Sequence, residues 1–348
     1  MNKAKKHANI PIFIPHEGCP NDCVFCNQRK ITGTTLPADR DIRPEIEEAL
    51  CTIDPDIYDT EIAFFGGSFT GICRSTMERL LADAYEYVKC GKVRTIRLST
   101  RPDYIDGEIL DILSRYGVRH IELGIQSASD KVLSACRRGH TFEQTERACR
   151  LINERGFILG GQMMTGLPSS TPGDEIYTAR EICRLGAKET RIYPTVVFRE
   201  TELCNMAQNG EYLPLTIGDA VSRTAECLKI FIRNGVKVLR VGLQSGENLS
   251  DPNEVFAGAN HPALGELCES AVYLDLIKEK ITQLGSVPQD AKTLTVFAPC
   301  GETSKISGQK KHNKNEISRI LSEMGCRNIN IKIKETQLEK YNVDIKFS

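Results

Sequence analysis

The sequence lacks the features that would place the protein in a membrane or outside the cell. No apolar run approaches the roughly 18–20 residues that a membrane-spanning helix needs. The first segment, MNKAKKHANIPIF, contains basic residues but no apolar stretch long enough for a signal peptide. The net charge of −1 also gives no overall excess of either sign. These absences predict an ordinary globular protein of the cytoplasm that has no membrane partner.

The sequence also lacks the character of a disulfide-stabilised domain. Its 14 cysteines are spread over 348 residues, whereas disulfide frameworks are typical of small secreted domains. Eleven of the cysteines stand singly, and Cys149, Cys183 and Cys227 lie on apolar faces of expected elements. We expect these eleven side chains to pack as small hydrophobic groups in the core.

Short β-branched runs alternate with amphipathic segments between residues 10 and 200. The expected strands are Ile10–Ile14, Glu61–Phe65, Thr95–Ser99, Arg119–Gly124, Phe157–Met164 and Thr190–Phe198. The expected helices are Arg43–Cys51, Ser75–Lys89, Asp106–Tyr116, Phe142–Arg155 and Pro172–Leu185. Strands that alternate with helices in this way predict an α/β fold with a parallel sheet. A helix at Ile217–Asn234 and a strand at Val236–Gly242 extend this region.

Polar or glycine-containing segments follow most of the expected strands. They are GCPNDC, GGSFTG, STRPD, GIQSA and MTGLPSS. In a (β/α) barrel the carboxyl ends of the strands all open on one face, where active sites lie. A doubly wound sheet would instead concentrate its site at one switch point. We therefore predict a partial (β/α)6 barrel of the TIM type, with a small C-terminal α/β domain.

Three cysteines form a cluster of a different kind. Cys19, Cys23 and Cys26 have the spacing Cys-x3-Cys-x2-Cys, and no fourth cysteine follows nearby. A [4Fe–4S] cluster normally takes four cysteines, so three leave one iron open to a small molecule. A structural zinc site is normally closed by four protein ligands, and His16 could serve as the fourth. Both kinds of metal site are compatible with these residues.

Further motifs follow the cysteines along the chain. FFGGSFTG ends the second expected strand, and a glycine pair there either makes a tight turn or lets the backbone approach a ligand. STRPDY, IELGIQS, RRGHT, MMTGLP and RIYPTVVFRETEL then follow in order, each near the end of a strand. With these motifs the sequence resembles the radical S-adenosylmethionine (radical SAM) superfamily. From about residue 61 to 245 it resembles the radical SAM domain of the elongator-complex catalytic subunit family, which modifies wobble uridines in tRNA.

The resemblance implies two cofactors and a set of residues that hold them. Cys19, Cys23 and Cys26 would ligate a [4Fe–4S] cluster, and its open iron would bind S-adenosylmethionine (SAM). An electron donor of the flavodoxin or ferredoxin type would reduce the cluster, which then cleaves SAM to a 5′-deoxyadenosyl radical. The residues expected around SAM are Phe25, Gly66, Gly67, Ser99, Glu122, Gln126, Arg138, Gln162 and Tyr193. By resemblance, Gly66 and Gly67 would hold the methionine amino group, Arg138 the carboxylate, Glu122, Gln126 and Gln162 the ribose, and Tyr193 the adenine.

Some polar residues in these motifs have structural interpretations as well. Glu122 and Gln126 alternate with apolar residues along one strand, and a polar strand face inside a barrel favours contact with a ligand. Arg101 and Asp103 fit either the site or a surface ion pair. His261 fits either a substrate contact at the barrel mouth or a structural role.

Three departures from the elongator family limit what can be transferred, and one is that Ser99 stands where related enzymes often have a Glu. The cysteine segment is more compact, and residues 246–348 contain nothing like the acetyltransferase domain of that family. We predict a radical SAM enzyme that modifies an RNA, in particular a tRNA. A radical SAM enzyme for a small molecule such as a tetrapyrrole is one alternative, because several motifs are shared with the oxygen-independent coproporphyrinogen dehydrogenase branch. A non-catalytic metal-containing nucleic-acid-binding protein is the other.

The C-terminal region has a charge balance of its own. Residues 303–334 hold eight Lys or Arg against two Glu, an excess that suits a phosphate-bearing partner such as RNA. The turn SGQKKHNK resembles the Gly-x-x-Gly loop of KH RNA-binding modules, although Lys311 replaces the second glycine. A charged face on a capping domain is the alternative, since no aromatic stacking residues accompany the lysines. We expect a radical SAM core over residues 1–245, a connecting loop and helix over 246–275, and a small basic α/β domain over 276–348.

Overall fold

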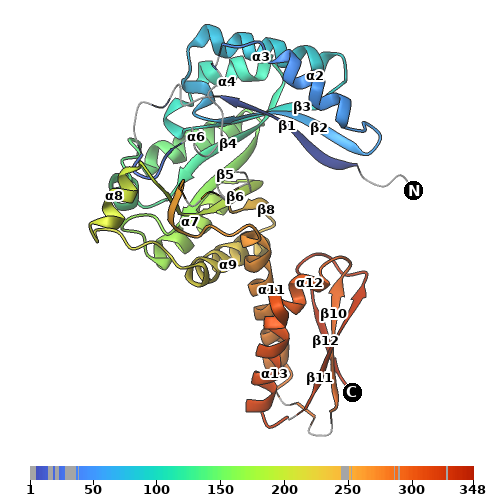
Figure 1. Cartoon of the computed structure of the whole chain (residues 1–348). Helices are drawn as coiled ribbons and strands as arrows, with labels where there is room; N and C mark the ends of the chain where they lie inside the picture. Colours follow the sequence, from blue (N-terminus) through green and yellow to red (C-terminus); the bar gives the residue numbers. More distant parts are fainter. Residues whose placement is uncertain are drawn as a thin grey trace.

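The computed structural model describes residues 5–14, 19, 23–27, 37, 39–243, 251, 253–285, 287–288, 291–326 and 328–348. Within these residues the strands form a seven-stranded sheet, a three-stranded sheet and a two-stranded ribbon. Figure 1 shows the large sheet with helices along its outer side, and the three-stranded sheet in a separate C-terminal body. His16, the alternative fourth metal ligand, lies outside the described residues.

The seven-stranded sheet is parallel, with the strand order β1-β2-β3-β4-β5-β6-β8. Its strands are β1 Lys6–Ile14, β2 Tyr58–Gly66, β3 Thr95–Thr100, β4 Val118–Gln126, β5 Ile158–Thr165, β6 Glu189–Pro194 and β8 Lys237–Val241. Strands that are neighbours in the sheet follow one another in sequence, as in a (β/α) barrel that does not close. The predicted partial barrel is confirmed, and the strand expected at Val236–Gly242 joins the six barrel strands as β8.

The prediction of a single strand at Thr190–Phe198 is wrong. β6 ends at Pro194, whose nitrogen cannot donate a hydrogen bond to a neighbouring strand. The next strand, β7 at Val196–Phe198, leaves the large sheet and pairs antiparallel with β9 at Val255–Gly258. Both halves are rich in β-branched residues, so composition gives no sign of the break.

Helices follow most of the strands of the large sheet. They are α2 Arg43–Thr52, α3 Arg74–Lys89, α4 Gly107–Arg115, α5 Asp130–Ala135, α6 Phe142–Glu154, α7 Pro172–Arg184, α8 Glu202–Gln208 and α9 Ile217–Arg233. Short 3-10 turns, η1 at Phe69–Gly71 and η2 at Pro102–Tyr104, follow β2 and β3. Thr141 and Thr171 begin α6 and α7 with capping boxes. The expected helices agree with the structure to within one residue at each end, and α5 and α8 are short helices that the prediction lacks.

The two faces of the large sheet differ in character. Ile62 and Leu98 lie on the face that packs against the helices, and both are fully buried in the main apolar core. Alternate residues of a strand point to the opposite face, and on β2, β3 and β4 these include Glu61, Arg97 and Glu122. The inside of the half-barrel is therefore polar and charged, as the alternation in β4 predicts.

The C-terminal body is built against one long helix. α11, Leu264–Gln283, packs against α9 of the half-barrel and also against the helices and β12 of the C-terminal body. The elements of that body are β10 Thr293–Pro299, α12 Thr303–Ser307, η3 Gln309–Lys311, α13 His312–Glu323, β11 Asn330–Thr336 and β12 Asp344–Phe347, with the strand order β11-β10-β12. α11 runs across the boundary expected between residues 275 and 276. No helix in the described ranges is long and apolar enough to cross a membrane.

The eleven single cysteines divide into two groups. Cys136, Cys149, Cys204, Cys227, Cys268 and Cys326 are buried, whereas Cys51, Cys73, Cys90 and Cys300 are exposed and Cys183 is half-buried. Core packing is thus confirmed for six of them and wrong for the four exposed ones. Each exposed cysteine lies at or beside the end of a helix or strand, where the apolar face gives way to solvent. No cysteine in the described ranges takes part in a disulfide.

Candidate active site

The cysteine segment is anchored to α5 and α8 by its main chain. Val24 N–H donates to the Cys136 carbonyl oxygen (3.2 Å), and Leu203 N–H donates to the Val24 carbonyl oxygen (2.8 Å). Phe25 packs with Val24 against a small apolar cluster that includes residues of both helices. These contacts fix the segment that carries Cys23 and Cys26 on the half-barrel.

N–H groups lie beside two of the cysteine sulfurs. Arg138 Nη1 donates a hydrogen bond to Cys23 Sγ (3.3 Å), and the Ser68 main-chain N–H lies close enough to Cys19 to stabilise its thiolate. Burial raises the pKa of the Cys19 thiol, whereas the Ser68 N–H and the Arg101 guanidinium act to lower it. N–H donors and positive charge stabilise thiolates, which are the form that ligates iron.

The glycine pair brings the end of β2 against the end of β1. Gly66 has a φ of +108°, and a Cβ atom there would lie 2.3 Å from the Ile14 carbonyl oxygen. Gly67 N–H donates to the same carbonyl oxygen (3.2 Å). The backbone geometry by itself therefore requires glycine at position 66, whether or not a ligand binds there. The turn that Gly66 permits brings Ser68 N–H close to Cys19.

Three hydroxyl groups, which the sequence prediction missed, join the ends of β2 and β3. Thr100 Oγ1 lies 2.9 Å from Ser68 Oγ and 2.6 Å from Thr70 Oγ1. Ser68 Oγ also accepts a hydrogen bond from Arg101 N–H (3.3 Å). The three hydroxyls lie at strand ends among motif residues, and that position is the signal that could have identified them.

Arg101 is buried and has one unused hydrogen-bond donor. Its side chain donates to both carboxylate oxygens of Asp103 (2.9 Å each), and its Nη2 donates to the Arg138 carbonyl oxygen (2.6 Å). Nη1 is buried and has no hydrogen-bond partner among the described residues. The expected ion pair between Arg101 and Asp103 is present. It is not a surface ion pair, because only 3% of Arg101 is exposed. The guanidinium is close enough to interact electrostatically with Cys23 and Cys19.

Gln126 ends β4 in a conformation that non-glycine residues rarely adopt. Its φ is +65°, and the pairing of β4 with β5 is irregular between Gly124 and Gln126. Its Oε1 atom is buried without a hydrogen-bond partner in the described part of the chain. Arg138 Nη2 donates to the Gly124 carbonyl oxygen (2.7 Å). The Arg138 side chain therefore bridges the end of β4 and the Cys23 sulfur.

His140 is a further buried group near Arg101 and Arg138 that the sequence prediction missed. Burial, aided by the positive charge of Arg138, lowers its pKa to about 4, so the imidazole is neutral at pH 7. Nδ1 lies 3.3 Å from the Thr141 carbonyl oxygen and donates to it. Nε2 is then an acceptor, and it has no partner among the residues that the structure describes.

Glu122, Gln162 and Ser99, three of the residues predicted around SAM, lie together inside the half-barrel. Gln162 Nε2 donates to Glu122 (2.9 Å) and to Ser99 Oγ (3.1 Å). Glu122 also accepts from Arg191 Nε (2.6 Å) and Arg97 Nη1 (2.9 Å). Burial by itself would raise the pKa of Glu122, but Arg191 and Arg97 hold it below its usual value. Glu122 thus carries a full negative charge that two arginines neutralise.

Arg97 is the centre of a second group of ion pairs that the sequence prediction missed. Its Nε donates to Glu61 (3.1 Å) and its Nη1 to Glu189 (2.7 Å), while its Nη2 lies 3.0 Å from His120 Nδ1. Arg97 is 1% exposed, so it depends on these partners. The available signal was a charged residue at alternate positions of β-branched runs, as in TIRLST and ETRIYP.

The remaining predicted residues have different surroundings. Tyr193 lies two residues after Arg191 on β6 and so on the same strand face, and burial raises the pKa of its hydroxyl. His261 Nδ1 accepts a hydrogen bond from Ala263 N–H (3.1 Å) just before α11, which favours the structural interpretation. Across the described residues, no three His, Cys, Asp or Glu side chains lie close enough together to hold a metal ion. Convergence of the three cysteine sulfurs on one cluster therefore stays a prediction.

Comparisons with known proteins identify the family. The radical SAM superfamily model matches residues 13–182, and the radical SAM C-terminal domain model matches residues 187–273. An uncharacterized protein of Methanocaldococcus jannaschii is 27% identical over 239 residues, which are 65% of this chain and 72% of that protein. The tRNA uridine(34) acetyltransferase of the same organism is 32% identical over 127 residues, 36% of this chain and 24% of that protein. Elongator complex protein 3 of Schizosaccharomyces pombe is 26% identical over 251 residues, 64% of this chain and 46% of that protein.

A solved structure has the same fold. It is the archaeal Elp3 of Methanocaldococcus infernus with an N-terminal deletion, and it aligns with a TM-score of 0.60 at 21% identity over 82% of this chain and 65% of that one. The chain spans about a quarter of the length of the related acetyltransferase and about half of the related elongator protein. The two family matches together cover more than half of the chain. The strands of the open parallel half-barrel run in order from β1 to β8, and the chain belongs to the radical SAM superfamily of enzymes.

Proposed function

We propose that this radical SAM enzyme modifies an RNA, with tRNA as its substrate class. Cys19, Cys23 and Cys26 would hold three irons of a [4Fe–4S] cluster and leave the fourth iron for SAM. When bound and reduced by a donor of the flavodoxin or ferredoxin type, the cluster supplies the electron that cleaves SAM to methionine and a 5′-deoxyadenosyl radical. The surrounding residues orient SAM and hold the cysteine sulfurs.

One observation carries the cofactor part of this proposal. Two buried polar atoms, Arg101 Nη1 and Gln126 Oε1, have no hydrogen-bond partner among the described residues, and Arg101 interacts electrostatically with Cys19 and Cys23. Leaving a buried polar group unpaired is unfavourable by about 1–3 kcal/mol, so both atoms favour a ligand at this place. The methionine carboxylate of SAM suits the guanidinium donor, and an N–H or O–H group of SAM suits the amide acceptor.

The same contacts change the roles that the resemblance implies. Arg138 donates to Cys23 Sγ and to the Gly124 carbonyl oxygen, so we assign it to holding the cysteine segment. Arg101, with its unused donor, is the better anchor for the SAM carboxylate. Glu122 is already bound to two arginines, and we assign it to positioning Gln162.

The RNA part of the proposal is supported by the relatives and by the charge of the C-terminal body. One relative is named a tRNA uridine(34) acetyltransferase, and residues 303–334 carry eight basic side chains against two acidic ones. Positive charge gathered on one module favours the phosphate backbone of a nucleic acid. This chain shares the half-barrel of those relatives, so the proposal covers radical chemistry on RNA and no acetyl transfer.

Nucleosides of tRNA from a deletion strain and its parent test this function. We expect mass spectrometry to show one modified nucleoside that is absent from the deletion strain and a precursor that accumulates. Wild-type protein and the Cys73→Ala variant should restore it, because Cys73 is exposed and far in sequence from Cys19, Cys23 and Cys26. The Cys23→Ala variant should not restore it. An unchanged nucleoside profile would argue against RNA and in favour of a small-molecule substrate.

A further inference from the structure

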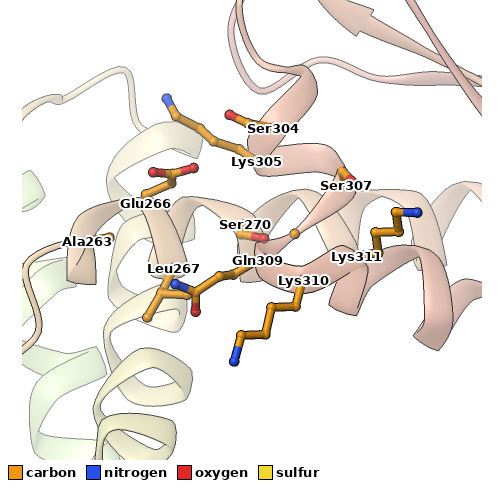
Figure 2. A pocket seen from close by; sticks show the side chains of 11 residues that line it. Ala263, Glu266, Leu267, Ser270, Ser304, Lys305, Ser307, Gln309, Lys310 and Lys311 are labelled. Carbon is orange, nitrogen blue, oxygen red and sulfur yellow. The ribbon is translucent and has the colours of Figure 1, made fainter.

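A cavity with mainly polar lining residues lies in the C-terminal body, far in sequence from Cys19, Cys23 and Cys26. It has a volume of about 330 Å³, and Figure 2 shows the side chains that line it. α11 contributes Glu266, Leu267 and Ser270. α12 and the following turn contribute Ser304, Lys305, Ser307, Gly308, Gln309, Lys310 and Lys311. The second group spans the KH-like turn that the sequence singles out.

The charge balance of the cavity is set by two lysines. Lys305 forms ion pairs with Glu269 (2.6 Å) and Glu302 (3.0 Å), so its charge is already neutralised. Lys310 and Lys311 are exposed, and neither forms an ion pair with any described residue. Glu266 is an acidic residue of the lining and offsets part of this charge. The cavity keeps a net positive edge that no described side chain neutralises.

The turn that carries these lysines is held firmly against α11. Asn313 is 1% exposed, and its Nδ2 donates to the Ser270 carbonyl oxygen (2.8 Å), to Ser270 Oγ (3.0 Å) and to the Lys305 carbonyl oxygen (3.2 Å). A Cβ atom on Gly308 would lie 2.8 Å from Asn313 N. The cavity is therefore preorganised, since its two sides are joined by buried hydrogen bonds.

The backbone of the two lysines is strained. Lys310 has a φ of +51° and Lys311 a φ of +62°, a conformation that costs about 1 kcal/mol or more for a non-glycine residue. Asn or Gly would adopt it more easily. The sequence thus keeps two long cations where smaller residues would fit the backbone better, which indicates a role for the charges themselves.

We propose that this cavity binds a phosphodiester group of the RNA backbone, with Lys310 and Lys311 as the charged contacts. A phosphodiester carries one negative charge and accepts hydrogen bonds from ammonium and hydroxyl groups, and Ser304 and Ser307 supply the hydroxyls. No aromatic side chain lines the cavity within the described residues, so it suits the backbone of the RNA and not its bases. This proposal rests on the RNA substrate proposed above, and it identifies the part of the chain that binds the RNA backbone.

Binding of bulk tRNA to the full-length, cluster-loaded protein tests the proposal, measured by fluorescence anisotropy over a series of salt concentrations. We expect the Lys310→Gln/Lys311→Gln double variant to bind at least 10-fold more weakly than wild type, with a salt slope shallower by about 1–2. The matched control is Lys332→Gln/Lys334→Gln. Those lysines are exposed on β11, on the strand face opposite to Ile331, which packs in the core of the C-terminal body.

The possible outcomes separate this inference from the proposed function. A selective loss in the Lys310/Lys311 variant, with the control within 2-fold of wild type, supports the cavity. Equal losses in both variants, or none in either, overturn it and leave RNA as the substrate. Failure of wild-type protein to bind tRNA overturns both, and competition by polyglutamate as strong as by tRNA would assign the cavity to an acidic protein partner. Release of 5′-deoxyadenosine from SAM without RNA should be the same in all variants, since the lysines lie outside the cysteine site.

Discussion

Gly66 has no room for a side chain, because a Cβ atom there would lie 2.3 Å from the Ile14 carbonyl oxygen. The glycine pair was visible in the sequence, but its two explanations, a tight turn and a ligand contact, could not be separated there. The structure accounts for Gly66 by the meeting of two strand ends. Arg101 and Asp103 give a similar lesson, since spacing suggests their ion pair but does not reveal that Arg101 is buried.

Substitution of Gly66 tests the steric argument. Gly66→Ala is expected to reduce the free energy of unfolding by at least 3 kcal/mol, since it combines a positive φ with a backbone clash. Gly91→Ala is the matched control, because Gly91 has a φ of +73° and nothing within 4 Å of the added Cβ; it should cost about 1 kcal/mol. Urea unfolding measures both. Equal losses in the two variants would contradict the clash.

Substitution of Arg101 tests its role as the carboxylate anchor. Arg101→Met should weaken SAM binding to iron-loaded protein by 10-fold or more, because the buried donor and its charge are lost. Iron content should fall less in Arg101→Met than in Arg138→Met, because only Arg138 donates a hydrogen bond to Cys23 Sγ. Equilibrium dialysis measures the affinity for SAM, and iron analysis measures the iron content. Wild-type SAM affinity in Arg101→Met would refute the assignment, and Arg94→Met serves as a control at an exposed arginine.

At the scale of elements, the alternation of strands and helices was predictable because most of the longer helices show a 3.6-residue apolar period, and several have a capping residue or a glycine at one end. The break between β6 and β7 was not predictable, since Pro194 sits within one continuous run rich in β-branched residues. α5 and α8 are too short to show a period. The sequence prediction recognised the charged interior on β4 alone. Its partners on β2, β3 and β6 depend on strand register, which the sequence does not give.

The interior ion pairs make a prediction about stability and pH. Burial would raise the pKa of Glu189, but hydrogen bonds from His120 and Arg97 lower it from 4.5 to about 2. Its stabilising effect is therefore complete above pH 4.5 and is lost as the pH falls towards 2. Glu189→Gln should cost about 3 kcal/mol at pH 7, and the difference from wild type should shrink below pH 4.5.

Urea unfolding at several pH values measures this effect. Glu108→Gln is the control, because Glu108 forms an exposed ion pair with Arg74 and is 76% exposed at its side chain. Its effect should stay below about 1 kcal/mol at every pH. A cost for Glu189→Gln that did not change with pH would contradict the lowered pKa.

At the scale of the whole molecule, the half-barrel and the basic C-terminal body were both predictable, but their connection was not. α11 crosses the expected boundary at residue 276 and serves both parts, since its residues pack in the core of each. From the sequence, a domain boundary can be inferred only where the charge balance or the apolar periodicity changes. Neither changes along a helix such as α11 that packs in two cores. The burial of single cysteines could not be predicted either, because it depends on which ends of helices and strands are exposed to solvent.

Cysteine labelling tests the arrangement of the whole chain. Brief alkylation of the native protein should modify Cys51, Cys73, Cys90 and Cys300, and leave the six buried cysteines unmodified until the protein unfolds. Cys73 should react fastest at neutral pH, because hydrogen bonds from Ser75 and neighbouring N–H groups lower the pKa of its thiol. Peptide mass spectrometry reads each site. Labelling of Cys149 or Cys227 at the rate of Cys51 would contradict the packing of the half-barrel.

The central claim is that Cys19, Cys23 and Cys26 hold a cluster that cleaves SAM. The most direct measurement is 5′-deoxyadenosine released from SAM by anaerobically reconstituted, dithionite-reduced protein. We expect wild type and Cys73→Ala to release it at the same rate, and Cys23→Ala to release at least 100-fold less and to contain little iron. Protein that holds four irons and four sulfides yet releases no 5′-deoxyadenosine, or a Cys23→Ala variant as active as wild type, would contradict the claim.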